Sequence, residues 1–109
     1  MFDINAYKLP LNTSADDRAR VQVLGMAINA FSQGVAYFHA GIETLRSKSM
    51  DGNSYDSGDW FNRLDWQFND NYFATGLPPA RDNEKNYALI KPRLQNGLIK
   101  PGPQQIQVA

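Results

Sequence analysis

The sequence predicts an incomplete α/β unit: a helix over residues 15–33, a buried strand over 35–40 and a loop-rich region over 41–109. Two observations predict it. Apolar residues recur every three or four positions before Gly34, whereas residues 35–40 form a short apolar run without polar alternation. Such a strand is buried on both faces and needs parallel neighbours. Since the sequence contains no other convincing strand, we expect the neighbouring strands to belong to a part of the protein outside this sequence.

The start of the predicted helix is well marked. Ser14 can cap it, and Asp16 and Asp17 lie in the first turn, where carboxylates favour the positive end of the helix dipole. Gly25 suggests close packing against a neighbour, and Gly34 can end the helix. The apolar positions form one stripe, at Val21, Leu24, Ala27, Ile28 and Phe31.

Composition excludes several classes of function. Eleven Lys and Arg balance 11 Asp and Glu, so the chain has no electrostatic footprint for nucleic acid. It has no cysteine and a single histidine, which exclude thiolate and His-rich metal sites. Residues 1–14, interpreted as a connecting loop, lack the apolar core of a secretion signal or membrane span. We expect no membrane partner, and the localisation is left open.

The region after Gly41 mixes charged residues with aromatic ones and has little periodicity. It contains several glycines and prolines, so long regular elements are not expected there. Six aromatic residues lie between Tyr55 and Tyr72 and argue against disorder. We therefore expect an ordered, functional loop region.

Residues 54–63 gather charged, amide and aromatic side chains after the predicted strand, where binding sites of parallel α/β folds lie. This composition suits a carbohydrate, because Asp59 can accept and Arg63 can donate hydrogen bonds to sugar hydroxyls. Their spacing of four also fits a local ion pair that holds a turn. Asp56 and Asp59 could be paired acids, but glycosidases need two carboxyls facing each other across the bond.

Other side chains have structural as well as functional interpretations. Trp60 and Trp66 can anchor the loop in a core or contact a ligand. His39 lies in an apolar segment, where a hydrogen-bonded structural role is more common than that of a base. Glu43 follows the predicted strand, a position that fits a catalytic carboxylate, a cap or an ion pair.

Five blocks of the sequence resemble the pullulanase and plant limit dextrinase family: GVAYFHAG (34–41), LRSKS (45–49), NSYDSGDWFNRLD (53–65), GLPPA (76–80) and IKP (90–92). A match of more than a dozen consecutive residues with flanking blocks in the correct order is specific. Two positions depart from the resemblance. Many members of the family have proline where this chain has Ala36, and a small or acidic residue where it has Ile42.

The resemblance implies a starch-debranching hydrolase of the α-amylase superfamily, which cuts α-1,6 linkages in pullulan, limit dextrins or other branched α-glucans. It also implies a (β/α)8 barrel, of which residues 15–33 resemble the seventh helix and residues 35–40 the eighth strand. The expected partners are the rest of that barrel and a branched α-glucan. The three catalytic carboxylates are expected upstream of Met1, so this chain has no catalytic residue and should be inactive alone.

The same resemblance places substrate binding in the loop after the eighth strand. The superfamily has an Asp and an Arg there, four residues apart, that contact a glucose, and Asp59 and Arg63 match them. Tyr55 and Trp60 are further candidates for substrate binding. We expect no metal ligand and no cofactor in this chain, and the calcium requirement of a longer protein is left open. The alternative function is a non-catalytic carbohydrate-binding or interaction module.

Overall fold

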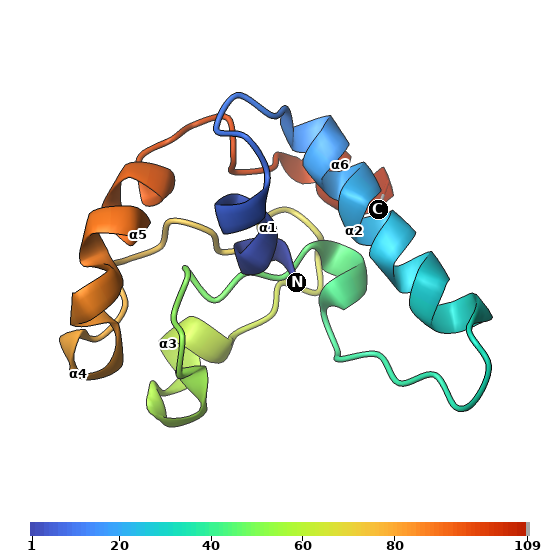
Figure 1. Ribbon diagram of the computed structural model, residues 1–109, viewed down its shortest axis with the longest axis horizontal. Coiled ribbons are helices and arrows are strands. Elements are labelled where there is room, and N and C mark those ends of the chain that lie inside the picture. Colours follow the sequence, from blue (N-terminus) through green and yellow to red (C-terminus); the bar gives the residue numbers. More distant parts are fainter. Residues whose placement is uncertain (109) are drawn as a thin grey trace.

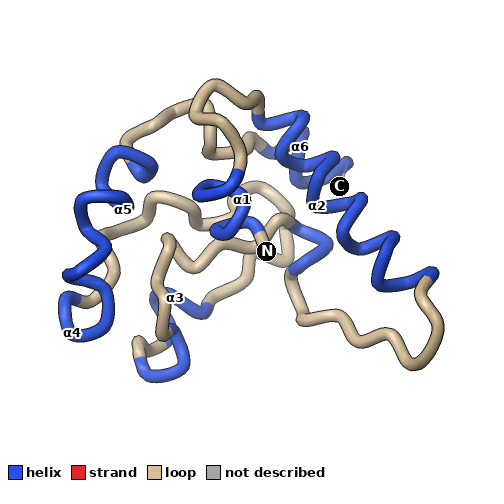
Figure 2. The backbone as a smooth tube through the Cα atoms, in the orientation of Figure 1, coloured by secondary structure: helices blue, strands red, loops and turns tan. Residues whose placement is uncertain are grey.

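The computed structural model describes residues 1–108, and every regular element in that part of the chain is helical. Figure 2 shows the helices joined by long loops. The α-helices are α1 (Phe2–Lys8), α2 (Ala15–Phe31), α3 (Asp59–Asn62), α4 (Ala80–Asn83), α5 (Tyr87–Leu94) and α6 (Pro103–Val108). The 3-10 turns are η1 (Ile42–Thr44), η2 (Ser54–Asp56) and η3 (Glu84–Asn86).

The sequence predicts only one of the two helices nearest the N-terminus. The Ser14 hydroxyl oxygen accepts a hydrogen bond from the backbone N–H of Asp17 at 3.1 Å, which caps α2. By contrast, α1 has no side-chain cap and lies within residues 1–14, where a loop was expected. It forms because Phe2 and Ala6, one helical turn apart, are both buried in the core.

The strand predicted over residues 35–40 does not form, so the prediction of an α/β fragment of a (β/α)8 barrel is wrong for the described residues. Residues 35–39 belong to no regular element, and Val35 and Tyr37 are 80% and 84% exposed. One bond, from Asn29 Nδ2 to the carbonyl of Tyr37 (2.8 Å), ties this segment to α2. Figure 1 shows it as a loop at one edge of the molecule. A strand needs backbone partners, and no neighbouring strand exists within residues 1–108.

The apolar stripe of α2 also lies on the surface. Leu24, Ile28 and Phe31 are 60%, 62% and 89% exposed. The face that α2 buries instead consists of Arg18, Ala19 and Gln22. We call Leu24, Ile28, Phe31, Val35 and Tyr37 together the α2 apolar surface. Single exposed apolar side chains are ordinary, but a group of this size on one helix and the segment tied to it is a feature of interaction sites.

The core draws its residues from the whole length of the chain. The rings of Phe2 and Phe73 meet edge to face with their centroids 5.6 Å apart, an arrangement that aromatic pairs favour. This contact joins α1 to the loop between α3 and α4. The buried apolar residues are Phe2, Ala6, Ala19, Leu45, Met50, Phe73, Ile90, Ile99 and Ile106.

A buried guanidinium fixes the path of the chain between α1 and α2. Arg18 is 0% exposed and donates hydrogen bonds to the carbonyls of Asn5 (3.1 Å), Pro10 (2.8 Å) and Thr13 (3.2 Å). Burial lowers the pKa of the Arg18 guanidinium. The three bonds offset that cost of desolvation, because hydrogen bonds from a charged donor are stronger than neutral ones.

The loop over residues 65–75 is ordered by side chains that bond to its backbone. The Asp65 carboxylate accepts from the N–H groups of Gln67 and Asn69, both at 2.9 Å, and of Asp70 at 3.0 Å. These bonds favour the ionised form, so they lower the pKa of Asp65. The loop therefore keeps a defined shape without a helix or strand.

Replacing Arg18 with Met should lower the free energy of unfolding by about 2 to 4 kcal/mol, because three carbonyls lose a charged donor. Urea denaturation followed by circular dichroism measures this. The matched control is Arg20→Met, since the Arg20 side chain is 83% exposed and pairs only with Asp17 at the surface. That control should change stability by less than about 0.5 kcal/mol. Equal effects of the two substitutions would contradict the role of Arg18.

The amide proton shifts of Gln67, Asn69 and Asp70 should titrate together, with a midpoint below 3.8, the ordinary pKa of aspartate. Because the pKa of Asp65 is lower in the folded state, its contribution to loop stability is present above that ordinary value. It is lost as the pH falls through the lower folded pKa. NMR between pH 6 and 2 measures the midpoint, and Asp65→Asn should abolish the shared transition. A midpoint at or above 3.8 would refute this account of the loop.

Candidate functional site

α3 is a single turn that other segments hold in place. Gly58, which precedes it, has φ +75° and ψ −174°, a conformation essentially restricted to glycine. The side-chain amide of Asn62 donates to the carbonyls of Ser54 (2.6 Å) and Gly58 (2.8 Å), and Arg46 donates to the carbonyl of Asn62. Because a four-residue helix is not stable alone, these bonds determine the direction of its side chains.

The guanidinium of Arg63 lies between two aromatic rings. Its Cζ atom is 3.9 Å from the centroid of Trp60 and 4.0 Å from that of Tyr72, well within the range of cation–π contacts. The indole N–H of Trp60 donates to the carbonyl of Thr75 at 2.9 Å, which holds this ring. Arg63 Nε is buried and has no hydrogen-bond partner within residues 1–108. Stacking therefore sets the position of the guanidinium.

Asp59 and Arg63 do not form the local ion pair that their spacing allows. All ion pairs in the described part of the chain involve other residues. Asp59 is exposed at the start of α3, and Arg63 is half-buried just after its end. Their carboxylate oxygens and terminal guanidinium nitrogens thus keep their capacity to accept and donate hydrogen bonds.

Tyr72 completes this cluster, although the sequence did not single it out. Its φ of +63° is unusual for a bulky residue. Its two neighbours are anchored in the interior: Asn71 is 2% exposed and donates to the carbonyl of Leu45 at 2.9 Å, and Phe73 is 0% exposed. With both neighbours held, the Tyr72 ring lies against Arg63. Its aromatic character was the only signal in the sequence.

The other aromatic and acidic candidates have different environments. Tyr55 is 91% exposed, and Trp60 and Trp66 are 54% and 63% exposed, so neither tryptophan is a core anchor. Asp56 forms an ion pair with Arg81 at 3.2 Å. One of the two acids, Asp56, is thus already in an ion pair. The arrangement therefore does not fit the interpretation of Asp56 and Asp59 as paired acids.

His39 and Glu43 make local contacts. Arg46 Nη1 lies 3.0 Å from His39 Nε2. Since a guanidinium only donates, Nε2 accepts and the ring proton is assigned to Nδ1. Glu43 accepts a hydrogen bond from the backbone N–H of Gly41 at 3.0 Å. Both side chains thus support the turn that contains η1.

One half-buried carboxylate outside the Arg63 cluster also holds the fold together. Asp3 accepts hydrogen bonds from the Ser47 hydroxyl and from the Lys48 backbone N–H (2.9 Å). Burial raises the pKa of Asp3, against the lowering effect of these two bonds. Both carboxylate oxygens are used, so Asp3 ties α1 to the segment that follows η1.

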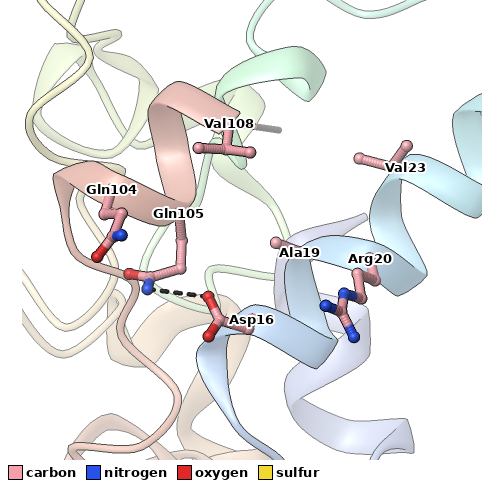
Figure 3. Close-up of a pocket in the computed structure, with 7 residues that line it drawn as sticks. All are labelled: Asp16, Ala19, Arg20, Val23, Gln104, Gln105 and Val108. Atoms are coloured by element: carbon pink, nitrogen blue, oxygen red, sulfur yellow. Dashed lines mark hydrogen bonds between the residues drawn. The ribbon is translucent and has the colours of Figure 1, made fainter.

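A separate groove of about 450 Å³ lies between α2 and α6. Figure 3 shows Gln105 on α6 donating to Asp16 on α2, at 3.0 Å, with Ala19, Val23 and Val108 along the apolar wall. The residues that line the groove include no aromatic ring and none of the substrate-binding candidates from the sequence. Its composition therefore does not match that of the Arg63 cluster.

Within residues 1–108, no helix is long and apolar enough to cross a membrane. No group of three or more His, Cys, Asp or Glu side chains in that range is placed to hold a metal ion.

Known proteins resemble this chain over nearly its whole length. Residues 68–109 match the family described as alpha-1,6-glucosidases, pullulanase-type, C-terminal. Pullulanase 1, chloroplastic, from Arabidopsis thaliana is 52% identical over 101 residues, which are 93% of this chain and 10% of that protein. Pullulanase from Klebsiella aerogenes is 37% identical over 107 residues, 98% of this chain and 10% of that protein.

Solved structures agree with these matches. PulA from Klebsiella oxytoca has a TM-score of 0.90 and 37% identity, over 97% of this chain and 10% of that one. Klebsiella pneumoniae pullulanase complexed with maltotriose has a TM-score of 0.89 and 38% identity, over 97% and 10%. The chain spans about a tenth of the length of these relatives. Sequence and structure agree along the chain, which therefore belongs to the pullulanase family.

Proposed function

We propose that a longer protein containing this chain hydrolyses α-1,6-glucosidic linkages in pullulan, limit dextrins or other branched α-glucans. In that protein, Asp59 and Arg63 bind a glucose unit of the substrate and line the sugar cleft. The observation that carries this role is the position of Arg63 between Trp60 and Tyr72, without an ion-pair partner in the described residues. Membership of the family supports the choice of linkage.

The chemistry of the cluster suits a neutral sugar. The Asp59 carboxylate accepts hydrogen bonds from hydroxyl groups and the Arg63 guanidinium donates to them, and such charge-assisted bonds are about twice as strong as neutral ones. Trp60 is 54% exposed, so part of the indole is available to the apolar face of a glucose ring. Tyr55 adds a second exposed ring close by in the sequence. Maltotriose, found with the Klebsiella pneumoniae relative, is a ligand of this chemical class.

We assign bond cleavage to another part of the longer protein. Hydrolysis of a glycosidic bond needs two carboxyls facing each other across it. Near α3, Asp56 pairs with Arg81 and Asp65 accepts three backbone hydrogen bonds. Asp59 alone can bind a hydroxyl but cannot supply both an acid and a nucleophile. In this proposal the catalytic carboxylates lie upstream of this chain in the longer protein, and the chain alone is inactive.

The α2 apolar surface packs against the remainder of the longer protein in this proposal. Its members Ile28 and Phe31 are 62% and 89% exposed, and apolar burial contributes roughly 25 cal/mol per Å². The relatives are about ten times as long as this chain, so they contain ample polypeptide to cover such a surface. The partner is thus a part of the same enzyme.

Replacing Asp59 with Ala in the full-length protein should lower kcat/KM for pullulan by about 10- to 100-fold, since a charged hydrogen bond contributes about 1.5 to 3 kcal/mol. The melting temperature should not change. Asp56→Ala is the matched control, because this nearby carboxylate pairs with Arg81 at the surface. It should change kcat/KM by less than about twofold. Unchanged kinetics with lost stability in Asp59→Ala would mean that the residue is purely structural.

Replacing Ile28 with Ser in the full-length protein should lower the free energy of unfolding by about 1.5 to 3 kcal/mol, because the side chain loses apolar burial against the rest of the enzyme. Leu11→Ser is the control, since Leu11 is 50% exposed but outside the α2 apolar surface. Denaturant titration compares the two variants. If Ile28→Ser costs no more than about 0.5 kcal/mol, the surface remains in water and the packing proposal fails.

A further inference from the structure

We propose that Tyr72 is a positioning residue for Arg63: with Trp60 it covers the faces of the guanidinium, so that a ligand approaches in the guanidinium plane. This inference rests on the proposed sugar-binding function and makes it more specific. The group bound is a pair of adjacent hydroxyls on one sugar ring.

The distances leave little space at the guanidinium faces. The two ring centroids lie 3.9 Å and 4.0 Å from Arg63 Cζ, which is van der Waals contact. Because two rings cannot share one volume, the proposal places each on a different face of the guanidinium. Nε is buried as well, which leaves the terminal nitrogens as the accessible donors. Two parallel donors in one plane match two neighbouring oxygen atoms.

The backbone of Tyr72 is held in a conformation that a tyrosine seldom adopts. Its N–H donates to Asp70 Oδ1 at 2.7 Å, and its carbonyl accepts from the Thr75 hydroxyl at 2.8 Å. Asp70 in turn pairs with Lys100 at 3.2 Å. Strained residues persist only where their surroundings over-determine them, and they gather at functional sites.

Thr75 links the two residues whose rings contact Arg63. Its hydroxyl bonds to the carbonyl of Tyr72, and its own carbonyl accepts from the Trp60 indole at 2.9 Å. Thr75 therefore connects the Trp60 ring to the backbone of Tyr72 through hydrogen bonds. A change in this connection should affect sugar binding through Arg63 rather than directly.

The test is a double-mutant cycle with maltotriose titrated calorimetrically into the full-length protein. Tyr72→Leu should weaken binding by about tenfold, whereas Tyr72→Phe, which keeps the ring, should stay within about twofold of the natural protein. In an Arg63→Ala background, Tyr72→Leu should cause no further loss. Thr75→Val provides a milder second variant, with an expected loss of about threefold that also disappears without Arg63.

The binding of maltotriose analogues tests the assignment to two adjacent hydroxyls. A maltotriose analogue lacking one hydroxyl of the contacted pair should bind about tenfold more weakly than maltotriose to the natural protein. It should bind as well as maltotriose to Arg63→Ala. Equal binding of every single-deoxy analogue to the natural protein would overturn this assignment.

Other outcomes separate this inference from the function on which it rests. If the natural protein binds no maltotriose, the proposed sugar-binding function fails. If Arg63→Ala weakens binding but Tyr72→Leu and Thr75→Val do not, the function stands and the positioning role is overturned. Losses that simply add in the double variant would also overturn it, because a general structural role does not depend on Arg63.

Discussion

The edge-to-face contact between Phe2 and Phe73 is the interaction on which the rest of the structure depends. It connects the first helix to the loop that follows α3, and both rings are at most 1% exposed. Phe73 is the immediate neighbour of Tyr72, and Asn71 is held on the other side by the carbonyl of Leu45. The stack on Arg63 is therefore a consequence of core packing, and a short helix such as α3 could not build it alone.

The sequence indicated local features of the fold well and long-range ones poorly. Ser14 marks the start of α2 through a cap that needs only neighbouring residues. α1 has no such cap and depends on the burial of Phe2, which no local pattern reveals. The apolar run at residues 35–40 suggested a buried strand, but an apolar pattern does not say what covers it. In the described residues no strand pairs with it, and it lies exposed as a loop.

The candidate site was also only partly predictable from the sequence. The spacing of Asp59 and Arg63 is visible in the sequence, but it fits both a local ion pair and a sugar contact. Two aromatic rings on Arg63 and the absence of that ion pair within residues 1–108 favour the sugar contact. Tyr72 could not be selected, because its left-handed backbone results from the anchoring of its neighbours. The exposed α2 apolar surface also agrees with the proposal that this chain is a segment of a longer protein.

The most direct test of the central claim is a crystal structure of the full-length protein with bound maltotriose. The account predicts two adjacent sugar hydroxyls at about 2.7 to 3.1 Å from the terminal nitrogens of Arg63 and a third hydroxyl bonded to Asp59. The guanidinium should remain between Trp60 and Tyr72. A sugar bound elsewhere, or an Arg63 that leaves its rings to pair with Asp59, would contradict the account.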